Sequence, residues 1–265
     1  MKAYQTPAAR LSIGILTKNE ERLIEQCVRS ALFADEVVVL DSGSTDRTIK
    51  IAESLGARVE VDADWQGFAV QRNRLLAMTT GDYIFFLDAD EVITPALKDE
   101  LMGIVQSNER ALWSIRWQLI AFGKPLRHFR SSSSMARLFH RQVLDHFDGI
   151  VHEGPILKSG VEAQHHMLTN RLPHHSRQSV RASLEKLTQY AVLGAAKRQA
   201  AGARGGVIRG LFSALPVFVR TYFFRGAVLD GGPGFLYALF VALEFFFRYV
   251  ALEYDSEQLN ARISR

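Results

Sequence analysis

The stretch Tyr83-Ile84-Phe85-Phe86-Leu87, followed at once by Asp88-Ala89-Asp90-Glu91, decides the fold of this chain. Its first five residues form a continuous apolar run, which is typical of a strand buried on both faces of a parallel sheet. The acids begin where that strand ends. In parallel α/β sheets, ligands bind at the carboxyl ends of the strands, so the acidic segment indicates a binding edge.

Three further predicted strands precede this one. Residues 11–16, 36–40 and 57–61 each predict a short strand. Helical patterns lie between them. The first follows Glu20 and runs to Phe33, the second is expected to have Ser44 or Thr45 as its N-cap and runs to Leu55, and the third covers residues 69–78. Pro95 is expected to open a fourth helix. Strands that alternate with helices over short connections predict an α/β fold with a mostly parallel, right-handed sheet.

Polar and acidic residues follow each of the four predicted strands. Because the carboxyl ends of parallel strands meet at one edge, we expect these residues to line a single crevice. They are Thr17, Lys18, Asn19, Glu20 and Glu21 after the first strand, Asp41, Ser42, Gly43 and Ser44 after the second, Asp62 and Asp64 after the third, and Asp88, Asp90 and Glu91 after the fourth.

Composition excludes two broad classes of protein. The chain has 265 residues, 48% of them hydrophobic, so it is not globally disordered. Its one cysteine, Cys27, excludes a disulfide-stapled module and is expected to be a small buried hydrophobe in a reducing cytosol. Residues 1–10 lack an apolar run, so no secretory signal is expected.

The rest of the chain changes character twice. Residues 113–122 and 135–139 read as strands, whereas residues 179–201, 207–225 and 235–254 are expected to be helical, with residues 230–234 as a loop before the last helix. We therefore divide the chain into two halves of one α/β domain (1–108 and 109–176) and a helical, basic and amphipathic region (177–265).

This helical region carries most of the basic excess. Its charge pattern favours an anionic surface such as acidic lipid headgroups. Aromatic and arginine residues around the last two helices are typical of an amphipathic membrane-interface segment, and packing on the catalytic domain or at a dimer contact is the alternative. The charge-free windows, residues 210–219 and 231–243, are shorter than the roughly 18–20 residues of a bilayer span, so none is expected.

Asp88 and Asp90 are the sharpest candidates for chemistry. Two carboxylates flanking a small residue after a buried strand suit Mg²⁺ or Mn²⁺, which prefer hard oxygen ligands and leave positions open for phosphate. The alternative is a pair of solvated acids. Asp41 is a candidate for nucleotide binding, and an Asx turn or helix cap is its alternative. Trp65 and Phe68 either cover a sugar or belong to the core.

Together, residues 17–21, 41–48, 71–73 and 87–91 resemble the GT-A, family 2 glycosyltransferases. The resemblance is closest to the lipopolysaccharide-core glucosyltransferases of the WaaE type and covers essentially the whole chain. It implies that residues 1–108 are the nucleotide-sugar-binding half and that residues 109–176 are the acceptor and catalytic-base half of the same domain. It implies that Thr17, Asn19, Glu20 and Asp41 hold the uridine and that Gln71 and Ala89 belong to the same nucleotide-sugar site. It further implies that Arg72 lies by the uracil or diphosphate, that Asp88 contacts ribose or metal, and that Asp90 binds the divalent ion.

The resemblance also implies a general base. Val151-His152-Glu153 resembles the family's V-H-E element, in which the acid deprotonates the acceptor, so Glu153 is the expected base and His152 an orienting or packing residue. A structural salt bridge is the alternative for Glu153. His175 is implied near the diphosphate or its metal. Arg137 either stabilises phosphate or is a surface cation.

These residues lead to one functional hypothesis. The chain is expected to be a metal-dependent inverting hexosyltransferase, peripheral on the cytoplasmic face of the bacterial inner membrane. It would move a hexose from a UDP-sugar to a lipid-linked oligosaccharide, and the favoured hexose is glucose. The expected acceptor is the inner core of lipopolysaccharide. Another lipid-linked glycan or a polyprenyl phosphate is the alternative acceptor. A non-enzymatic nucleic-acid- or membrane-binding protein is the alternative class, although acids at the strand ends would repel nucleic acid.

Overall fold

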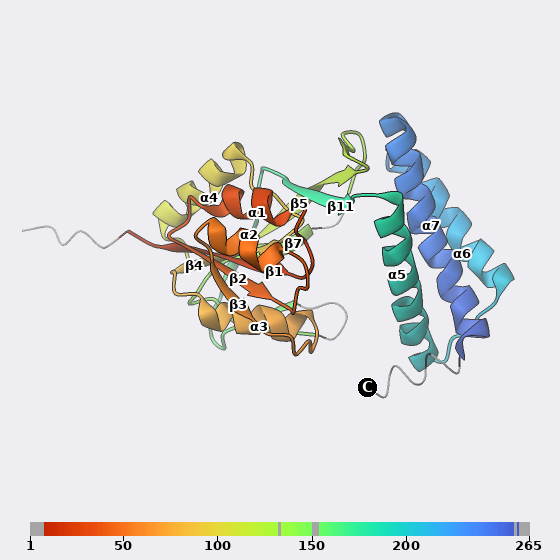
Figure 1. Cartoon of the computed structure of the whole chain (residues 1–265), viewed down its shortest axis with the longest axis horizontal. Coiled ribbons are helices and arrows are strands. Elements are labelled where there is room, and N and C mark those ends of the chain that lie inside the picture. The colour runs from red at the N-terminus through yellow and green to blue at the C-terminus, as the bar shows by residue number, and fades with distance from the viewer. Residues whose placement is uncertain (1–7, 132–133, 150–153, 257–258, 260–265) are drawn as a thin grey trace, which may run out of the picture. The chain divides into compact units, whose positions relative to one another are not determined.

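The structure is a computed structural model that describes residues 8–131, 134–149, 154–256 and 259. The chain forms two compact units. The first comprises residues 1–117 and 132–174, and the second comprises residues 118–131 and 175–265. Figure 1 colours both by position along the chain.

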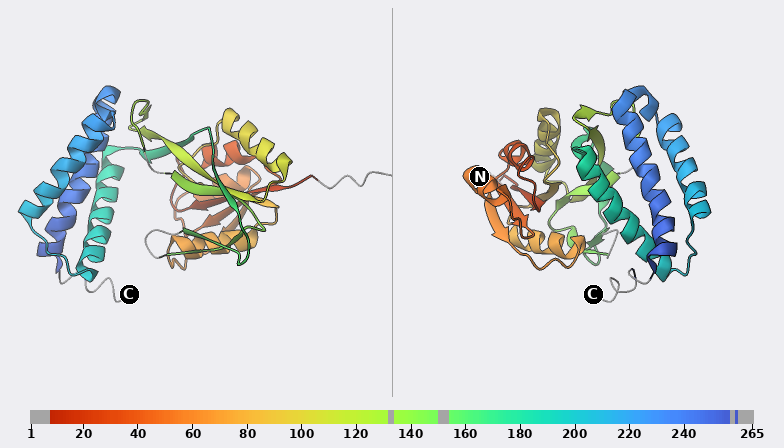
Figure 2. Two further views of the ribbon diagram at one scale, coloured as in Figure 1. Left: turned by 180° about the vertical axis from the view of Figure 1, so that it is seen from behind. Right: turned by 45° about the vertical axis from the view of Figure 1, so that its right-hand side comes forward.

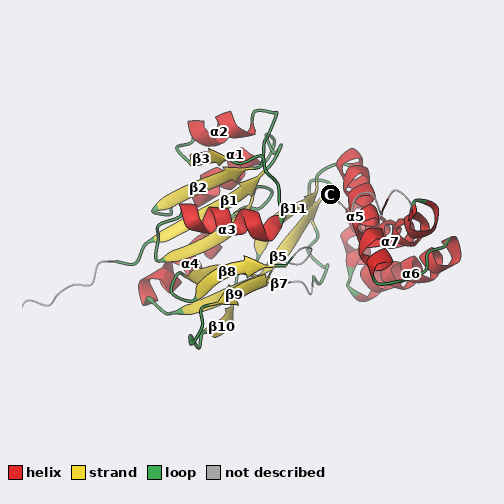
Figure 3. Ribbon diagram, turned by 90° about the horizontal axis from the view of Figure 1, so that it is seen from below, coloured by secondary structure: helices red, strands yellow, loops and turns green. Residues whose placement is uncertain are grey.

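The first unit is built on a sheet whose centre is parallel. Four strands lie in the order β4-β1-β2-β3, and each neighbouring pair is parallel (Figure 3). Their bounds are β1 Leu11–Thr17, β2 Glu36–Asp41, β3 Arg58–Val61 and β4 Tyr83–Asp88. The expected parallel arrangement of these four strands is therefore confirmed.

Beyond β4 the sheet becomes mixed. Strand β7 pairs antiparallel with both β4 and β5, and β10 pairs parallel with β5. The further strands are β5 Ala111–Ala121, β6 Lys124–Pro125, β7 Ser134–His140, β10 Gln164–Met167 and β11 Leu172–Arg177, and a separate pair consists of β8 Leu144–Asp148 and β9 Gly154–Leu157.

Helices cover both faces of this sheet. Helices α1 Ile24–Ala31, α2 Thr48–Ser54 and α4 Pro95–Ser107 lie on one face, and α3 Phe68–Met78 lies on the other (Figure 1). The strands supply apolar side chains to both faces because successive residues of a strand point in opposite directions. Phe85 packs in the cluster that includes α1, α2 and α4, whereas Phe86 packs in the cluster that includes α3.

Two helix starts differ from the expected ones. Helix α1 begins only at Ile24, because Glu20 and the residues after it form a turn. Helix α2 begins at Thr48, where the Asp46 carboxylate accepts the backbone N–H and hydroxyl of Thr48, so the expected cap at Ser44 or Thr45 is wrong. Pro95 opens α4 as expected.

The second unit is helical. Helix α7 Gly231–Tyr254 packs against both α5 Val180–Ala200 and α6 Val207–Val219 (Figures 1 and 2). A π-helical turn, Arg220–Phe224, and a 3₁₀ turn, Ala227–Asp230, join α6 to α7. The last helix thus begins at Gly231, inside the segment expected to be a loop. Its glycines have low intrinsic helix propensity, and packing in the unit outweighs that preference.

Within the described residues, two helical stretches have the length and composition of a membrane span, namely Val207–Phe224 and Ala227–Tyr254. Within the second unit, 11% and 33% of their most apolar windows are buried. The expectation that no segment is long enough is therefore wrong. Counting charge-free residues alone was too strict, because one or two long charged side chains can extend toward the interface.

Candidate active site

The strand register brings the predicted site residues to one edge. Thr17 pairs with Asp41, Asp41 pairs with Val61, and Leu16 pairs with Asp88. The ends of β4, β1, β2 and β3 are therefore level with one another. The polar segments that follow them line the same edge of the sheet, as the sequence predicts.

Asp88 is held by two arginines. Arg137 donates to both carboxylate oxygens, at 3.2 Å and 2.5 Å, and Arg72 donates to Oδ1 at 3.3 Å. Burial alone would raise the pKa of Asp88, but the charges of Arg137 and Arg72 outweigh it and hold the pKa well below its usual range. Asp88 is therefore a carboxylate at neutral pH whose charge is already compensated.

Arg137 is buried, so the surface-cation interpretation is wrong. Its side chain is 1% exposed and also donates to Oε1 of Glu91 at 3.0 Å. Glu91 is fully buried, accepts the backbone N–H of Asp88 and accepts the indole N–H of Trp117 at 2.5 Å. Burial raises the pKa of Glu91 to about 7 even though Arg137 opposes it. Arg137 and Glu91 thus form a buried support beneath the aspartates.

Asp90 faces a histidine. Its Oδ2 lies 3.2 Å from Nε2 of His174, which stands on β11 and forms an isolated antiparallel bridge with Glu91. Burial favours the neutral imidazole, but the hydrogen bond and charge of Asp90 outweigh burial and raise the pKa of His174. The sequence expectation named His175 in this place. Successive residues of a strand point to opposite faces, so only one of the two can meet Asp90.

The donor set at Asp90 suits a small divalent cation. No group of three or more His, Cys, Asp and Glu side chains that could hold a metal ion exists among the described residues. Asp90 and His174 offer one carboxylate and one imidazole. Mg²⁺ is commonly held by one or two protein ligands, with substrate phosphates and water filling its other positions. The two residues therefore fit a metal that binds together with a diphosphate.

The loops after β1 and β2 are bonded to each other. Asn19 has a left-handed backbone (φ 53°), and its side-chain oxygen accepts the backbone N–H of Thr45. Its own N–H donates to Ser44, and the N–H of Glu20 donates to Thr48. Two short loops far apart in sequence thus make one surface at the strand ends.

Asp41 stabilises the loop after β2 through hydrogen bonds of its side chain. Its carboxylate is buried and accepts the backbone N–H groups of Gly43 and Ser44, at 2.9 Å and 2.6 Å, and the Ser44 hydroxyl at 2.5 Å. This is the Asx-turn arrangement that was the alternative for this residue. The proposed contact with uridine would have to share an oxygen already used in the turn.

Two buried polar atoms near these loops have no hydrogen-bond partner within the described part of the chain. They are Oγ1 of Thr17, at the end of β1, and Oε1 of Gln71, in the first turns of α3. Ala89 is also buried, and its N–H donates to the carbonyl of Leu16, the residue before Thr17. An unsatisfied buried acceptor costs roughly 1–3 kcal/mol, so such atoms mark a place where a bound group would be stabilising.

Some predicted residues do not join this cluster. Glu153 and His152 lie outside the described residues, so the general base stays a prediction. His175 belongs to the second unit. The sequence assigned no role to Glu91, His174 or Trp117. Glu91 lies in the acidic segment after β4, and His174 is the neighbour of His175. The spacing of these residues does not indicate which side chain of each segment points into the site.

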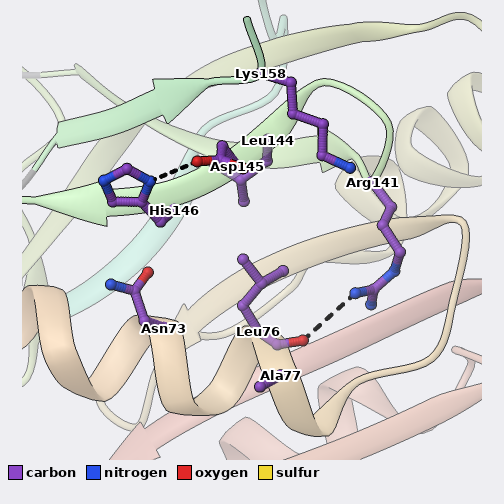
Figure 4. A pocket seen from close by; sticks show the side chains of 8 residues that line it. All are labelled: Asn73, Leu76, Ala77, Arg141, Leu144, Asp145, His146 and Lys158. Atoms are coloured by element: carbon purple, nitrogen blue, oxygen red, sulfur yellow. Dashed lines mark hydrogen bonds and ion pairs between the residues drawn. The ribbon is translucent and has the colours of Figure 1, made fainter.

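A separate cavity of about 600 Å³ lies between α3 and β8 (Figure 4). Its polar side chains are largely occupied. Arg141 donates to backbone carbonyls of Leu76 and Gly81, and Asn73 exchanges hydrogen bonds with the backbone of Phe147. None of the aspartates at the strand ends lines it. We assign the chemistry to the strand ends.

Sequence comparison relates the chain to one family. A family model described as glycosyl transferase family 2 matches residues 12–151. An uncharacterized glycosyltransferase of Rickettsia bellii is 29% identical over 95% of this chain and 88% of its own. The lipopolysaccharide core biosynthesis glycosyltransferase LpsC of Rhizobium meliloti is 26% identical over 97% of this chain and 96% of its own.

A structure comparison finds glucosyl-3-phosphoglycerate synthase from Mycobacterium tuberculosis, solved with Mn²⁺, UDP and glucosyl-3-phosphoglycerate. It is 30% identical, with a TM-score of 0.37, over 42% of this chain and 44% of its own. The match thus spans less than half of that solved chain.

Proposed function

This chain belongs to glycosyl transferase family 2, and from that premise we propose that it is a metal-dependent inverting hexosyltransferase of lipopolysaccharide-core assembly. Its sheet has the GT-A-like architecture of the family, and it is a glycosyltransferase. Membership also removes the non-enzymatic nucleic-acid-binding alternative. The proposed donor is a UDP-sugar, of which UDP-glucose is the favoured one, and the proposed acceptor is a lipid-linked oligosaccharide.

The arrangement of Asp88, Asp90 and His174 is the observation that carries this proposal. Asp88 is charge-compensated by Arg72 and Arg137, which suits it to accept hydrogen bonds from ribose. Asp90 with His174 offers the two donors of a divalent cation site. We therefore assign the ribose to Asp88, for which the sequence left ribose and metal open, and the cation to Asp90.

A cation bound at Asp90 and His174, Mg²⁺ or Mn²⁺, would supply positive charge for the departing diphosphate. The protein would hold the donor with its anomeric carbon facing the acceptor. An acceptor hydroxyl attacks that carbon, the bond between the carbon and the diphosphate oxygen breaks, and UDP leaves. We assign the hydroxyl proton to Glu153 as general base. Attack opposite to the leaving group inverts the anomeric centre.

The second unit supports a peripheral location on the cytoplasmic face of the inner membrane. Helix α6 exposes large apolar side chains, which is costly in water and typical of a membrane-interface helix. They are Ile208 (70% exposed), Leu211 (56%), Phe212 (76%) and Leu215 (64%). Arg204, Arg209, Arg220 and Arg225 lie along the same segment and suit anionic headgroups. LpsC, which acts in lipopolysaccharide core biosynthesis by name, agrees with this location.

The proposal is tested by screening donors and acceptors. The protein is incubated with Mn²⁺, a truncated lipopolysaccharide acceptor and UDP-glucose, UDP-galactose or their N-acetyl forms, and transfer is followed by mass spectrometry. A polyprenyl phosphate replaces the acceptor in a parallel series. We expect a hexose adduct on lipopolysaccharide that disappears with EDTA. Transfer only to polyprenyl phosphate, or transfer unaffected by EDTA, would contradict the corresponding part of the proposal.

A further inference from the structure

Trp65 and Phe68 form an exposed aromatic pair at the ligand edge of the sheet. Their ring centroids lie 4.9 Å apart at 89°, and the residues are 46% and 50% exposed. Their exposure shows that the core interpretation of these two residues is wrong. Large aromatic side chains left in water at a binding edge are candidates for stacking against a ligand.

The pair stands on a fixed loop. Arg74 of α3 reaches back to the carboxylates of Asp62 and Asp64, at 3.1 Å and 3.2 Å, and Gln66 donates to Asp64. Gly67, with φ 103°, then turns the chain so that Phe68 begins α3. These contacts position the two rings before any ligand is bound.

The strand order relates this pair to the aspartates. Strand β3, which leads to Trp65, lies three strands from β4, which leads to Asp88, so the ends of these two strands are about 14 Å apart. Helix α3 connects the two places, because Phe68 and Arg72 are one helical turn apart and Arg72 bonds Asp88. The aromatic pair and the aspartates thus belong to one edge.

The contacts on the β7 side of β4 favour one direction for a long ligand. There, Arg137 and Glu91 are buried and bonded to each other, and Glu91 also accepts the indole N–H of Trp117. A nucleoside diphosphate with its phosphates at Asp90 therefore extends toward β1, β2 and β3. Its phosphates and its base are at opposite ends, so its base arrives where Trp65 and Phe68 stand.

We infer that Trp65 and Phe68 form the stacking platform for the nucleobase of the donor, an inference that rests on the proposed function. The unpartnered Oε1 of Gln71, one turn along α3 from Phe68, is an independent sign that a hydrogen-bonding ligand belongs here. Stacking uses the face of the base, which all bases possess, so the platform provides affinity and leaves selection between bases to polar groups.

The test is calorimetric titration of the full chain with UDP and, separately, with pyrophosphate, both with Mn²⁺. Stacking contributes about 1–3 kcal/mol per base, so Trp65→Ala should weaken UDP binding by roughly 5- to 150-fold. Pyrophosphate has no base, and its affinity should not change. Trp65→Phe should restore most UDP binding. Leu32→Ala, at a residue that is 45% exposed on the first unit, is the matched control and should bind UDP normally.

Intrinsic fluorescence gives a second readout. The chain has three tryptophans, and Trp65 is the exposed one among them. Stacking predicts that UDP, but not pyrophosphate, quenches a signal that Trp65→Phe removes. Equal loss of UDP and pyrophosphate affinity in Trp65→Ala would overturn the inference in favour of a structural role. Unchanged UDP affinity with a raised acceptor KM would overturn it in favour of an acceptor site. Failure of the unmodified protein to bind any of UDP, GDP and ADP would instead overturn the proposed function itself.

Discussion

Arg137 and Asp88 lie 49 residues apart in the sequence and are joined by two hydrogen bonds, from NH1 to Oδ1 at 3.2 Å and from NH2 to Oδ2 at 2.5 Å. The guanidinium also reaches Glu91. One buried cation therefore balances two carboxylates, and a strand from the antiparallel side of the sheet fixes the acidic turn that follows β4.

Arg137→Ala should be strongly destabilising. It leaves two carboxylates at the site without their shared partner, and loss of one member of a buried ion pair typically costs about 3–5 kcal/mol. Denaturant unfolding of purified protein measures this loss. Arg137→Lys keeps the charge but not the two-pronged geometry, so an intermediate stability is expected. Arg116→Ala, at an exposed arginine on β5, serves as the control, and equal effects of the two alanine variants would refute the buried-support interpretation.

Asp90→Asn should remove the metal dependence of UDP binding. The neutral amide is a poor ligand for a hard divalent cation, so adding Mn²⁺ should no longer strengthen UDP affinity and transfer should fall below detection. His174→Ala should weaken the same dependence partially. Titrations with and without EDTA measure both effects, and Asp145→Asn provides an exposed control. Retention of a Mn²⁺-dependent gain in Asp90→Asn would place the metal elsewhere.

Glu153→Gln should separate binding from transfer. The amide cannot accept the acceptor proton, so turnover should fall by about 10²- to 10⁴-fold while UDP affinity stays unchanged. Initial rates and calorimetry on the same preparation distinguish the two. Glu162→Gln, at an exposed acid of the first unit, should behave like the unmodified protein. A near-normal rate in Glu153→Gln would remove this residue from the mechanism.

Charge on the exposed face of α6 should release the protein from membranes. A double variant, Leu211→Asp with Phe212→Asp, places two anions where the apolar side chains would enter the interface. Co-sedimentation with vesicles containing anionic phospholipid should drop sharply, with unfolding curves showing that the variant remains folded. Leu32→Asp introduces an anion at an exposed apolar residue of the first unit and should sediment normally. Unaltered sedimentation of the double variant would refute the membrane face.

Gly14→Ala should destabilise the sheet without touching the site. A Cβ atom at Gly14 would lie 2.8 Å from Cγ of Leu75 on α3, closer than such atoms pack. Overpacking of this kind costs about 1–3 kcal/mol. Combining the substitution with Leu75→Val should recover part of the loss, which a double-mutant cycle measures. Additive losses in the pair would show that the steric explanation is wrong.

The sequence predicted most of the first unit because its signals are local. The apolar run at Tyr83–Asp88, the proline that opens α4 and the acids after each strand require no knowledge of distant residues. The level strand ends follow from parallel pairing. The fold class and the edge at which the polar segments gather could therefore be predicted from the sequence.

The partners of the site residues were not accessible in this way. Arg137 reaches Asp88 through an antiparallel pairing of β4 and β7, and sequence spacing does not encode that pairing. The sequence alone does not show whether His174 or His175 points toward Asp90, because that depends on which face of β11 is turned to the site. The proposed assignment of Asp88 to ribose and of Asp90 to a metal rests on the arginines around one and the imidazole beside the other. Each of these contacts is tertiary.

The cross-bonded loops after β1 and β2 have a consequence for how tightly a donor can bind. A flexible loop must give up conformational freedom when it closes around a ligand, and that entropic penalty subtracts from affinity. Here Asn19, Ser44 and Thr45 already immobilise each other through hydrogen bonds between the two loops. For the proposed donor, this preorganisation predicts a small entropic cost of binding at the loops after β1 and β2, because these loops need little rearrangement.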